Sequence, residues 1–435
     1  MPNTSRLVGN FHTEKFVKFV FKENEKLRKM NDLMISNVIL IKVIKESNAH
    51  FIAIHMQEVG GKNFEECISQ VPAFLNHLAA SMHEMGYSTG RAYLDLEFDL
   101  PESYNALGSL FFINDVILPR IRQYDFITKQ FVKLEKVFET YDHGLLKCRM
   151  LRKAKFPKDF WPSVKWGRKG YMHCRFRIDQ TVFDFVNVHL FHDESNIALI
   201  HENPALYSEN RKRALNFVLG ELKRINEDDM HSCPLFLFGD LNFRLNLQSF
   251  LNRITDDADL REDSTESTQS SICSTDGYGD FLTANSPNTN ELKPMTDFRR
   301  TVSAIEFRRS PDNSTSDIPS SCILRIEKKL FDYFNHKRLL NEWQGYLEDD
   351  REVHNFPYLR ELSINFPPTY PWSENPDESE SLMKTRAPAW CDRVLMNSRA
   401  LEMVKRDKFA KYDSFGKDVC MGDHKPVMLS FSMIL

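Results

Sequence analysis

Polar side chains suited to catalysis stand at the ends of four apolar segments of this sequence. They are Gln57 and Glu58, Asn187 and His189, Asp240 and Asn242, and Asp423 and His424. Taken one at a time, each is more simply interpreted as a turn residue or a satisfied core histidine. Taken together, their oxygens suit a hard cation such as Mg²⁺, a further carboxylate can position a water, and histidines can stabilise a phosphoryl group. The set therefore indicates a hydrolytic site at a sheet edge.

The segment LFLFGDLNFR, residues 235–244, shows the pattern most clearly. Four apolar residues in a row are typical of a strand that is buried on both faces. Asp240 and Asn242 follow it, and because they are two residues apart in an extended chain they point the same way. A turn after a strand also accounts for Gly, Asp and Asn, so this segment alone is compatible with a turn and with a catalytic site.

One other hydrolytic chemistry, that of the cysteine phosphatases, is excluded by the sequence. A cysteine phosphatase needs an arginine six residues after its nucleophile, and none of the eight cysteines has one; Cys391, for example, is followed at that distance by Asn397. The G-x-S-x-G pattern of a serine hydrolase occurs in GYSTG at 86–90, so the sequence alone does not exclude that chemistry. If the protein is a phosphatase, water is the attacking nucleophile.

The composition describes an ordinary globular protein. Of its 435 residues 42% are hydrophobic and 27% charged, which fits a chain that buries a large core. The net charge of -4 argues against a surface that grips nucleic acid, although it allows a local basic pocket. The cysteines form no C-x-x-C pair, so we expect reduced thiols rather than disulfides or a zinc site.

We expect neither a targeting signal nor a membrane anchor in this sequence. The first residues lack the apolar run of a secretory signal, no apolar run is long enough to span a bilayer, and the last five residues, FSMIL, contain no prenylation cysteine. We therefore expect a cytoplasmic protein with weak or no direct membrane anchoring, and leave open a peripheral association at the plasma membrane. Nothing in the sequence identifies protein partners.

The elements that must position the polar groups follow from the apolar patterns. Strands are predicted at 51–55, 107–113, 171–178, 182–190, 235–238, 392–396 and 426–432, and helices within 15–48, 62–85, 207–223 and 323–334. Polar Ser/Thr-rich tracts predict a long, largely disordered surface insertion at about 255–321, with a short ordered piece near 298–307. Strands and helices alternate without a repeat, which favours one α/β domain over residues 1–435.

Four longer motifs resemble the signatures of the inositol polyphosphate 5-phosphatase family. They are GDLNFRL at 239–245, FPPTY at 366–370, RAPAWCDRVL at 386–395 and GDHKPV at 422–427, and they occur in the family's order. The blocks HMQEVGGKNFE, ALGSLFF, WGRKG, VNVHLFHDESN and EKKLFDYFN are similar to the type I group of that family. The resemblance extends from about residue 49 to the end of the chain, apart from the polar insertion.

The resemblance implies a fold and an activity. The fold is α/β, a four-layer sandwich of two packed mixed sheets flanked by helices, as in the exonuclease–endonuclease–phosphatase superfamily. The implied reaction is Mg²⁺-dependent removal of the 5-phosphate from soluble inositol 1,4,5-trisphosphate and inositol 1,3,4,5-tetrakisphosphate, which terminates calcium signalling. The alternatives are a phosphoinositide-lipid 5-phosphatase, a nuclease or sphingomyelinase of the same superfamily, and a catalytically weak inositol-phosphate-binding protein.

The resemblance also implies roles for individual residues. Glu58 would hold Mg²⁺, with Asp423 near the metal. Asp240 would activate the attacking water, and Asn242 and His189 would contact phosphate. His424, oriented by Asp392, would stabilise the transition state. The substrate-binding residues would be Arg168, Lys169, Tyr370, Lys384 and Arg386.

The sequence departs from the family pattern at two internal positions. The family's first strand carries a metal-binding asparagine, for which Asn10 and Asn37 are both candidates here. Lipid-hydrolysing relatives have a lysine after the tyrosine of their Pro-Thr-Tyr motif, whereas Tyr370 is followed by Pro371. Because proline offers neither a charge nor an N–H donor, we expect the soluble substrates to be preferred.

Overall fold

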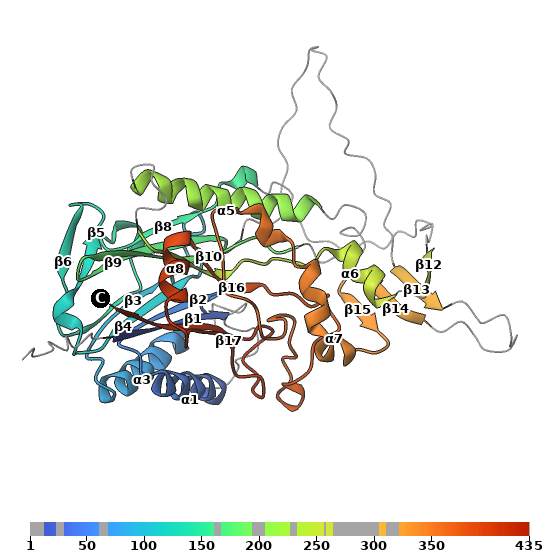
Figure 1. Cartoon of the computed structure of the whole chain (residues 1–435), viewed down its shortest axis with the longest axis horizontal. Coiled ribbons are helices and arrows are strands. Elements are labelled where there is room, and N and C mark those ends of the chain that lie inside the picture. Colours follow the sequence, from blue (N-terminus) through green and yellow to red (C-terminus); the bar gives the residue numbers. More distant parts are fainter. Residues whose placement is uncertain are drawn as a thin grey trace, which may run out of the picture.

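The computed structural model of the chain describes residues 13–22, 30–60, 68–160, 167–193, 205–226, 233–255, 258–263, 304–309 and 322–434. Two large mixed sheets pack face to face (Figure 1). The first sheet has the strand order β17-β18-β1-β2-β4-β3-β7. Its strands are β1 (Thr13–Lys22), β2 (Phe51–Gln57), β3 (Thr89–Leu94), β4 (Gly108–Ile113), β7 (Phe138–Tyr141), β17 (Lys411–Ser414) and β18 (Val427–Ile434).

The second sheet has the order β16-β11-β10-β9-β5-β6, and β8 also pairs with β9. Its strands are β5 (Ile121–Asp125), β6 (Gln130–Lys133), β8 (Arg152–Lys155), β9 (Gly170–Ile178), β10 (Thr181–His189), β11 (Leu235–Asp240) and β16 (Asp392–Met396). The pair β10–β11 is parallel and the pair β11–β16 is antiparallel. Parallel pairs also join β1 to β2 and β3 to β7, so both sheets are mixed.

Aromatic side chains fill the space between the two sheets. Phe51 of β2 lies 5.5 Å from Phe176 of β9 and 5.4 Å from Phe185 of β10, measured between ring centroids. Phe111 of β4 lies 4.8 Å from Phe176. Burying each such ring contributes about 1.5–3 kcal/mol to folding, and the pairwise geometry adds to that. This aromatic layer holds the two sheets together.

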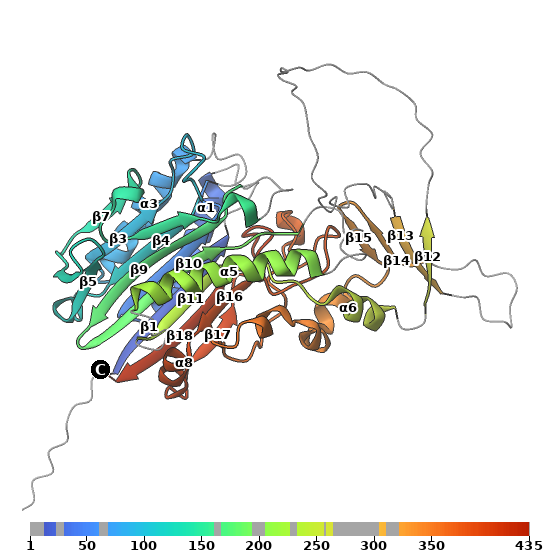
Figure 2. The same ribbon diagram turned by 90° about the horizontal axis from the view of Figure 1, so that it is seen from above.

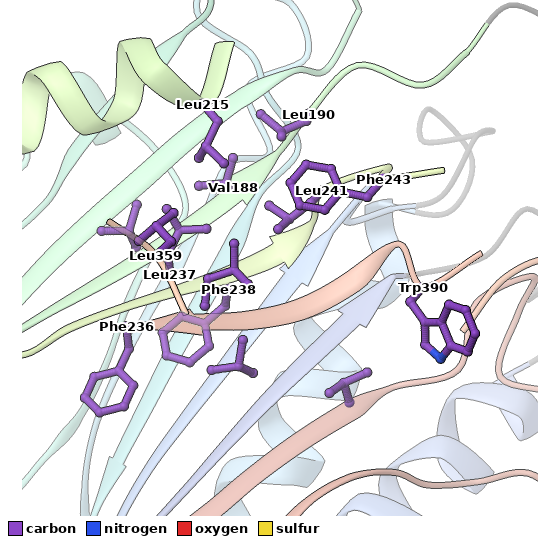
Figure 3. Close-up of a cluster of buried hydrophobic side chains, with 14 of the residues drawn as sticks. Val188, Leu190, Leu215, Phe236, Leu237, Phe238, Leu241, Phe243, Leu359 and Trp390 are labelled. Carbon is purple, nitrogen blue, oxygen red and sulfur yellow. The ribbon is translucent and has the colours of Figure 1, made fainter. Parts of the chain in front are cut away.

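Helices cover the outer faces of both sheets. The described residues contain the helices α1 (Met30–Ser47), α3 (Val71–Glu84), α5 (Ala205–Ile225), α6 (Leu247–Ile254), α7 (Arg338–Asn341) and α8 (Ser398–Lys405), among which α1, α3 and α5 pack on the two large sheets. Leu40 of α1 and Leu78 of α3 share a buried cluster with Ile52 of β2, so these helices cover the first sheet. Leu215 of α5 points toward Val188 of β10 on the second sheet (Figure 3). The predicted four layers, helices on two packed mixed sheets, are therefore confirmed.

Short 3₁₀ helices complete the regular structure: η1 (Ile68–Gln70), η2 (Leu118–Arg120), η3 (Leu145–Lys147), η4 (Lys158–Phe160), η5 (Trp343–Asp349), η6 (Glu352–Asn355) and η7 (Pro376–Glu378). Pro72 lies in the first turn of α3, where its missing N–H costs nothing. Within the described ranges, no helix is both long enough and apolar enough to cross a bilayer.

The prediction for the N-terminal region was wrong in part. Residues 13–22 form strand β1 between β2 and β18, whereas a helix was expected from residue 15. The segment TEKFVKFVFK contains several Phe and Val residues, which favour strands, and its lysines concealed that preference. Helix α1 does occupy the second half of the region.

The prediction of a helix at 323–334 was also wrong. That segment forms the hairpin of β14 (Cys322–Glu327) and β15 (Leu330–Tyr333). Leu324, Ile326, Phe331 and Tyr333 are buried. Because buried residues alternate with more exposed ones along most of this hairpin, the period is that of a strand rather than a helix.

The hairpin belongs to a third, four-stranded antiparallel sheet, with β12 (Ala258–Asp263) and β13 (Ala304–Arg309). Figure 2 shows this sheet beyond α6, at one end of the molecule. Phe331 packs on Phe250 of α6 with 6.1 Å between ring centroids. The predicted insertion therefore contains two paired strands, and the rest of it, including residues 264–303 and 310–321, lies outside the described residues.

Substitution of Phe331 tests how strongly the third sheet is attached. Phe331 is 0% exposed and Phe334, just beyond β15, is 62% exposed. We expect Phe331→Ala to lower the free energy of unfolding by about 3–5 kcal/mol because it leaves a cavity against Phe250. Phe334→Ala should cost less than about 0.5 kcal/mol. Urea denaturation of both variants measures the difference, and equal effects would contradict this packing.

Candidate active site

Three neighbouring strands of the second sheet bring three predicted residues together. In the strand register His189 of β10 is the partner of Asp240 of β11, which is in turn the partner of Asp392 of β16. His189 Nε2 lies 3.3 Å from Asp240 Oδ2. All three side chains are buried. Because each sits at the end of its strand that faces the same edge, the sheet itself assembles this row.

The first sheet contributes the residues that face this row. Glu58 directly follows β2, and its Oε1 lies 3.7 Å from His189 Nε2. His424 precedes β18, and its ring Nδ1 is hydrogen-bonded to Asp392 Oδ2 at 2.7 Å. Asp240, Asp392 and His424 offer ligand atoms that all lie within 4.8 Å of one another. The candidate site therefore straddles the ends of both sheets.

The turn after β11 has a geometry that places Asn242. Gly239 has φ +148°, and a Cβ at this position would lie 1.8 Å from Val188 O, so only glycine fits. The Asn242 backbone N–H donates to Asp240 Oδ1 at 3.0 Å, and its side-chain Nδ2 donates to Leu190 O at 3.0 Å. The segment is thus both a turn and part of the site, because the turn is the means by which both polar side chains are oriented.

Two cationic side chains from the segment before β9 lie beside His189 and Glu58. Lys169 Nζ contacts His189 Nε2, and Arg168 Nη2 lies 3.4 Å from Glu58 Oε2. Burial, together with the Lys169 ammonium, lowers the pKa of His189 to about 3. His189 is therefore neutral at physiological pH, and it acts there as a hydrogen-bonding group rather than as a cation.

The arrangement can hold a negatively charged group next to a buried base. Burial raises the pKa of Asp392, while its hydrogen bond to His424 opposes that shift. Hydrolysis of a phosphate ester by water needs a base and groups that stabilise negative charge. The site offers a carboxylate in Asp240, the Asp392–His424 pair, and two cations in Arg168 and Lys169.

Comparison with known proteins identifies the family of this chain. Residues 20–272 and 326–430 match the endonuclease/exonuclease/phosphatase family 2. A probable type I inositol 1,4,5-trisphosphate 5-phosphatase of Caenorhabditis elegans is 51% identical over 391 residues, which cover 90% of this chain and 92% of the relative. The chain belongs to the inositol polyphosphate 5-phosphatase family. The predicted enzyme class, a phosphoric monoester hydrolase, is thereby confirmed.

Further members of the 5-phosphatase family are more distant in sequence. Inositol polyphosphate-5-phosphatase A of Homo sapiens is 38% identical over 399 residues, which cover 90% of this chain and 87% of the relative. Among solved structures, the inositol polyphosphate 5-phosphatase domain of a synaptojanin, in complex with inositol (1,4)-bisphosphate and calcium ion, is 13% identical. Its TM-score is 0.47, and the match covers 97% of this chain and 85% of that chain.

The remaining residues predicted from the 5-phosphatase motifs differ in their position relative to the candidate site. The Tyr370 ring lies 4.7 Å from the His424 ring, measured between centroids. Arg386 is half-buried and lines a cavity of about 40 Å³ together with Asp193 and Arg244. Lys384 is exposed, and its ammonium is paired with Asp332 of β15 at 2.6 Å. Tyr370 is therefore part of the group, whereas Lys384 is engaged with the third sheet.

The two metal-site predictions from the start of the chain have different outcomes. Asn37, one of the two candidates, lies in helix α1 rather than on a strand, and its Nδ2 donates to Phe74 O at 3.4 Å. Asn10 lies outside the described residues. Strand β1, whose Lys22 is the register partner of Gln57, contains no asparagine.

Asp423, the residue predicted to lie near the metal, is half-buried, and its backbone carbonyl accepts the N–H of Trp372 at 2.9 Å.

Two residues that were not assigned a role connect the parts of the site. Asn187 of β10 accepts from Gln57 Nε2 at 2.7 Å and donates to Gly108 O at 2.8 Å, so it ties the second sheet to the first just below Glu58. Arg244 donates from Nη2 to Asn242 Oδ1 at 2.9 Å. Their presence in VNVHL and GDLNFRL was visible in the sequence, but their partners come from distant segments.

Proposed function

We propose that this chain is a Mg²⁺-dependent phosphomonoesterase that removes the 5-phosphate from inositol 1,4,5-trisphosphate and inositol 1,3,4,5-tetrakisphosphate, and so terminates calcium signals. The observation that carries the proposal is the buried Asp240 carboxylate next to the Asp392–His424 pair, with 2.7 Å between Asp392 Oδ2 and His424 Nδ1. The family membership and the names of the relatives support the substrate class.

The chain's own residues divide the chemistry between them. Asp240 acts as the general base, because one of its oxygens is held by the Asn242 N–H at 3.0 Å and the carboxylate faces the site. Asp392 fixes the tautomer and orientation of His424, which stabilises charge on the phosphoryl group. The neutral His189 and the amide of Asn242 contact the scissile phosphate.

The residues present fit a magnesium ion. Mg²⁺ prefers hard oxygen ligands, keeps several waters and is usually bound by one or two carboxylates together with substrate phosphate. Glu58 offers such a carboxylate at the junction of the two sheets, and Asp423 lies next to His424 in sequence. Asp392 Oδ1 is a further buried oxygen that has no hydrogen-bond partner among the described residues. When bound, the ion would neutralise the phosphate oxygens.

Cations on both sides of the site fit the other phosphates of the substrate. Arg168 and Lys169 lie beside Glu58 and His189, and Arg386 lines the small cavity near Tyr370. Arg386 can bind a phosphate through two parallel N–H donors. With Pro371 after Tyr370 and Lys384 paired to Asp332, fewer cations grip the 4-phosphate. This supports a preference for the soluble substrates over phosphatidylinositol 4,5-bisphosphate in a bilayer.

Phosphate release tests the proposal. Inositol 1,4,5-trisphosphate should lose one phosphate in the presence of Mg²⁺, and the reaction should stop on addition of EDTA. Inositol 1,4-bisphosphate, which lacks the 5-phosphate, is the matched control and should be inert. Equal or faster hydrolysis of phosphatidylinositol 4,5-bisphosphate in vesicles would make the chain a lipid phosphatase. Tight binding of the trisphosphate without turnover would make it a binding protein.

Arg386→Ala should raise the apparent substrate constant about tenfold with a smaller effect on turnover, because a charged hydrogen bond made in the ground state is lost. Lys384→Ala is the matched comparison, since Lys384 is already paired with Asp332. It should change the substrate constant by less than about threefold. Steady-state kinetics with inositol 1,4,5-trisphosphate measure both variants. A larger effect from Lys384→Ala would restore Lys384 as the main ligand of the 4-phosphate.

A further inference from the structure

Arg244 contacts two predicted site residues that come from distant parts of the chain. Its Nη2 donates to Asn242 Oδ1 at 2.9 Å. Its guanidinium group lies over the ring of Tyr370, with 4.6 Å between Arg244 Cζ and the ring centroid. Asn242 follows β11, whereas Tyr370 belongs to the FPPTY segment near the end of the chain. A single cation therefore connects a phosphate-contacting amide to a substrate-contacting ring.

The contact with Arg244 fixes the orientation of the Asn242 amide. The Nδ2 of Asn242 donates to Leu190 O at 3.0 Å, while its Oδ1 accepts from Arg244. A flipped amide would place its NH₂ against the guanidinium and its oxygen against the Leu190 carbonyl, so both contacts would become repulsive. In the observed orientation, the second N–H of Asn242 remains to donate to a phosphoryl oxygen.

The charge of Arg244 also changes the strength of that donor. A cation bonded to the carbonyl oxygen of an amide draws electron density away from its nitrogen, and hydrogen bonds in such a chain strengthen one another. The effect is larger when negative charge develops on the phosphoryl oxygens, which happens in the transition state rather than in the bound substrate.

Arg244 is itself held firmly. Its backbone N–H donates to Glu352 Oε1 at 3.0 Å. The same carboxylate is paired with Arg211 of α5, with 2.6 Å between Arg211 Nη2 and Glu352 Oε1. Arg211 is 2% exposed and contacts Asp193 as well. This network ties the strand end that carries Asn242 to helix α5, so Arg244 has little freedom to move.

We propose that Arg244 is a positioning residue for the reaction described under Proposed function, on which this inference rests. It orients and polarises the amide of Asn242 and holds the Tyr370 ring in place. Arg386, which lines the same cavity, faces the substrate and acts on binding. The two arginines therefore differ in the kinetic constant that they control, Arg244 acting on kcat and Arg386 on KM.

Arg244→Lys and Arg244→Ala test the proposal on the full-length protein. Arg244→Lys keeps the charge but loses the planar fork, and we expect kcat to fall about 10–100-fold with KM changed less than about threefold. Guanidinium ion added to Arg244→Ala should restore kcat at least in part, because the missing group is supplied in solution. Arg253→Ala, which removes an exposed arginine of α6 paired with Asp349, is the control and should show neither effect.

Coupling between residues supplies the second measurement. If Arg244 acts through Asn242, Arg244→Lys should lower kcat by less than about threefold in an Asn242→Ala background. Independent, additive losses would overturn the proposal. A rise in KM at unchanged kcat would do the same, since Arg244 would then bind substrate directly. Thermal melting of each variant identifies a mere folding defect, in which guanidinium restores nothing and the proposal fails.

The outcome for the wild-type protein separates the two proposals. If the wild-type protein is active and Arg244→Lys has the same kinetic constants as the wild type, only the proposed role of Arg244 is overturned. A wild type that releases no phosphate from inositol 1,4,5-trisphosphate overturns the proposed function and this inference together.

Discussion

Asp240→Asn is expected to lower kcat by about 10²–10⁴-fold, the range over which general bases contribute. Asp240 is 0% exposed, and its Oδ1 accepts the Asn242 N–H at 3.0 Å. An asparagine has the same shape and can keep that hydrogen bond through its own oxygen, but it cannot take a proton from water. The loss should therefore appear in turnover and leave the fold intact.

Phosphate release from inositol 1,4,5-trisphosphate and circular dichroism together measure this prediction. Asp332→Asn is a suitable control, because it makes the same chemical change at a carboxylate that pairs with Lys384 on the third sheet. Retention of a third or more of wild-type activity in Asp240→Asn would remove Asp240 from the mechanism. Loss of the circular dichroism signal would instead indicate that the charge of Asp240 stabilises the fold through His189.

Glu58→Gln is expected to raise the magnesium concentration that gives half-maximal activity by about 10–100-fold. A neutral amide is a poorer ligand for a hard cation than a carboxylate. The substitution also removes the ion pair between Glu58 Oε2 and Arg168 Nη2, which are 3.4 Å apart. Arg168→Met separates these effects, because it breaks the same ion pair and keeps the carboxylate.

Magnesium titrations of both variants decide between two arrangements. If Glu58 holds the ion, only Glu58→Gln should shift the magnesium dependence, and Arg168→Met should change the substrate constant. If the magnesium dependence of Glu58→Gln equals that of the wild type, Glu58 binds no metal. The compact group of Asp240, Asp392 and His424, with ligand atoms within 4.8 Å of one another, would then become the better metal site.

Several parts of the molecule could be predicted from local sequence alone. The buried strands β10, β11 and β16 were recognisable because short, continuous apolar runs bounded by polar residues are typical of strands inside a sheet. The long motifs GDLNFRL and RAPAWCDRVL indicated the family, which the comparisons confirm. The polar residues of the site were recognisable as well, because each stands at the end of such a run.

Other elements could not be predicted from local patterns, or were predicted wrongly. Strand β1 has lysines among its apolar residues, and its pairing with β2 and β18 outweighs the helical preference of that composition. The hairpin of β14 and β15 is stabilised by packing on α6, which local helical spacing does not reveal. Lys384, which is predicted to bind substrate, is paired with Asp332, a partner that becomes available only when that hairpin forms.

The sequence itself therefore determined the types of the proposed catalytic residues, the order of their motifs and the strands that carry them. Which atoms meet was decided by tertiary structure: His189 lies beside Asp240 and near Glu58, His424 is bonded to Asp392, and Arg244 lies between Asn242 and Tyr370. The physical reason is that these contacts depend on the register between neighbouring strands and on the packing of one sheet against the other. Both arise from interactions between residues far apart in the chain, and a one-residue change of register would turn each side chain to the opposite face.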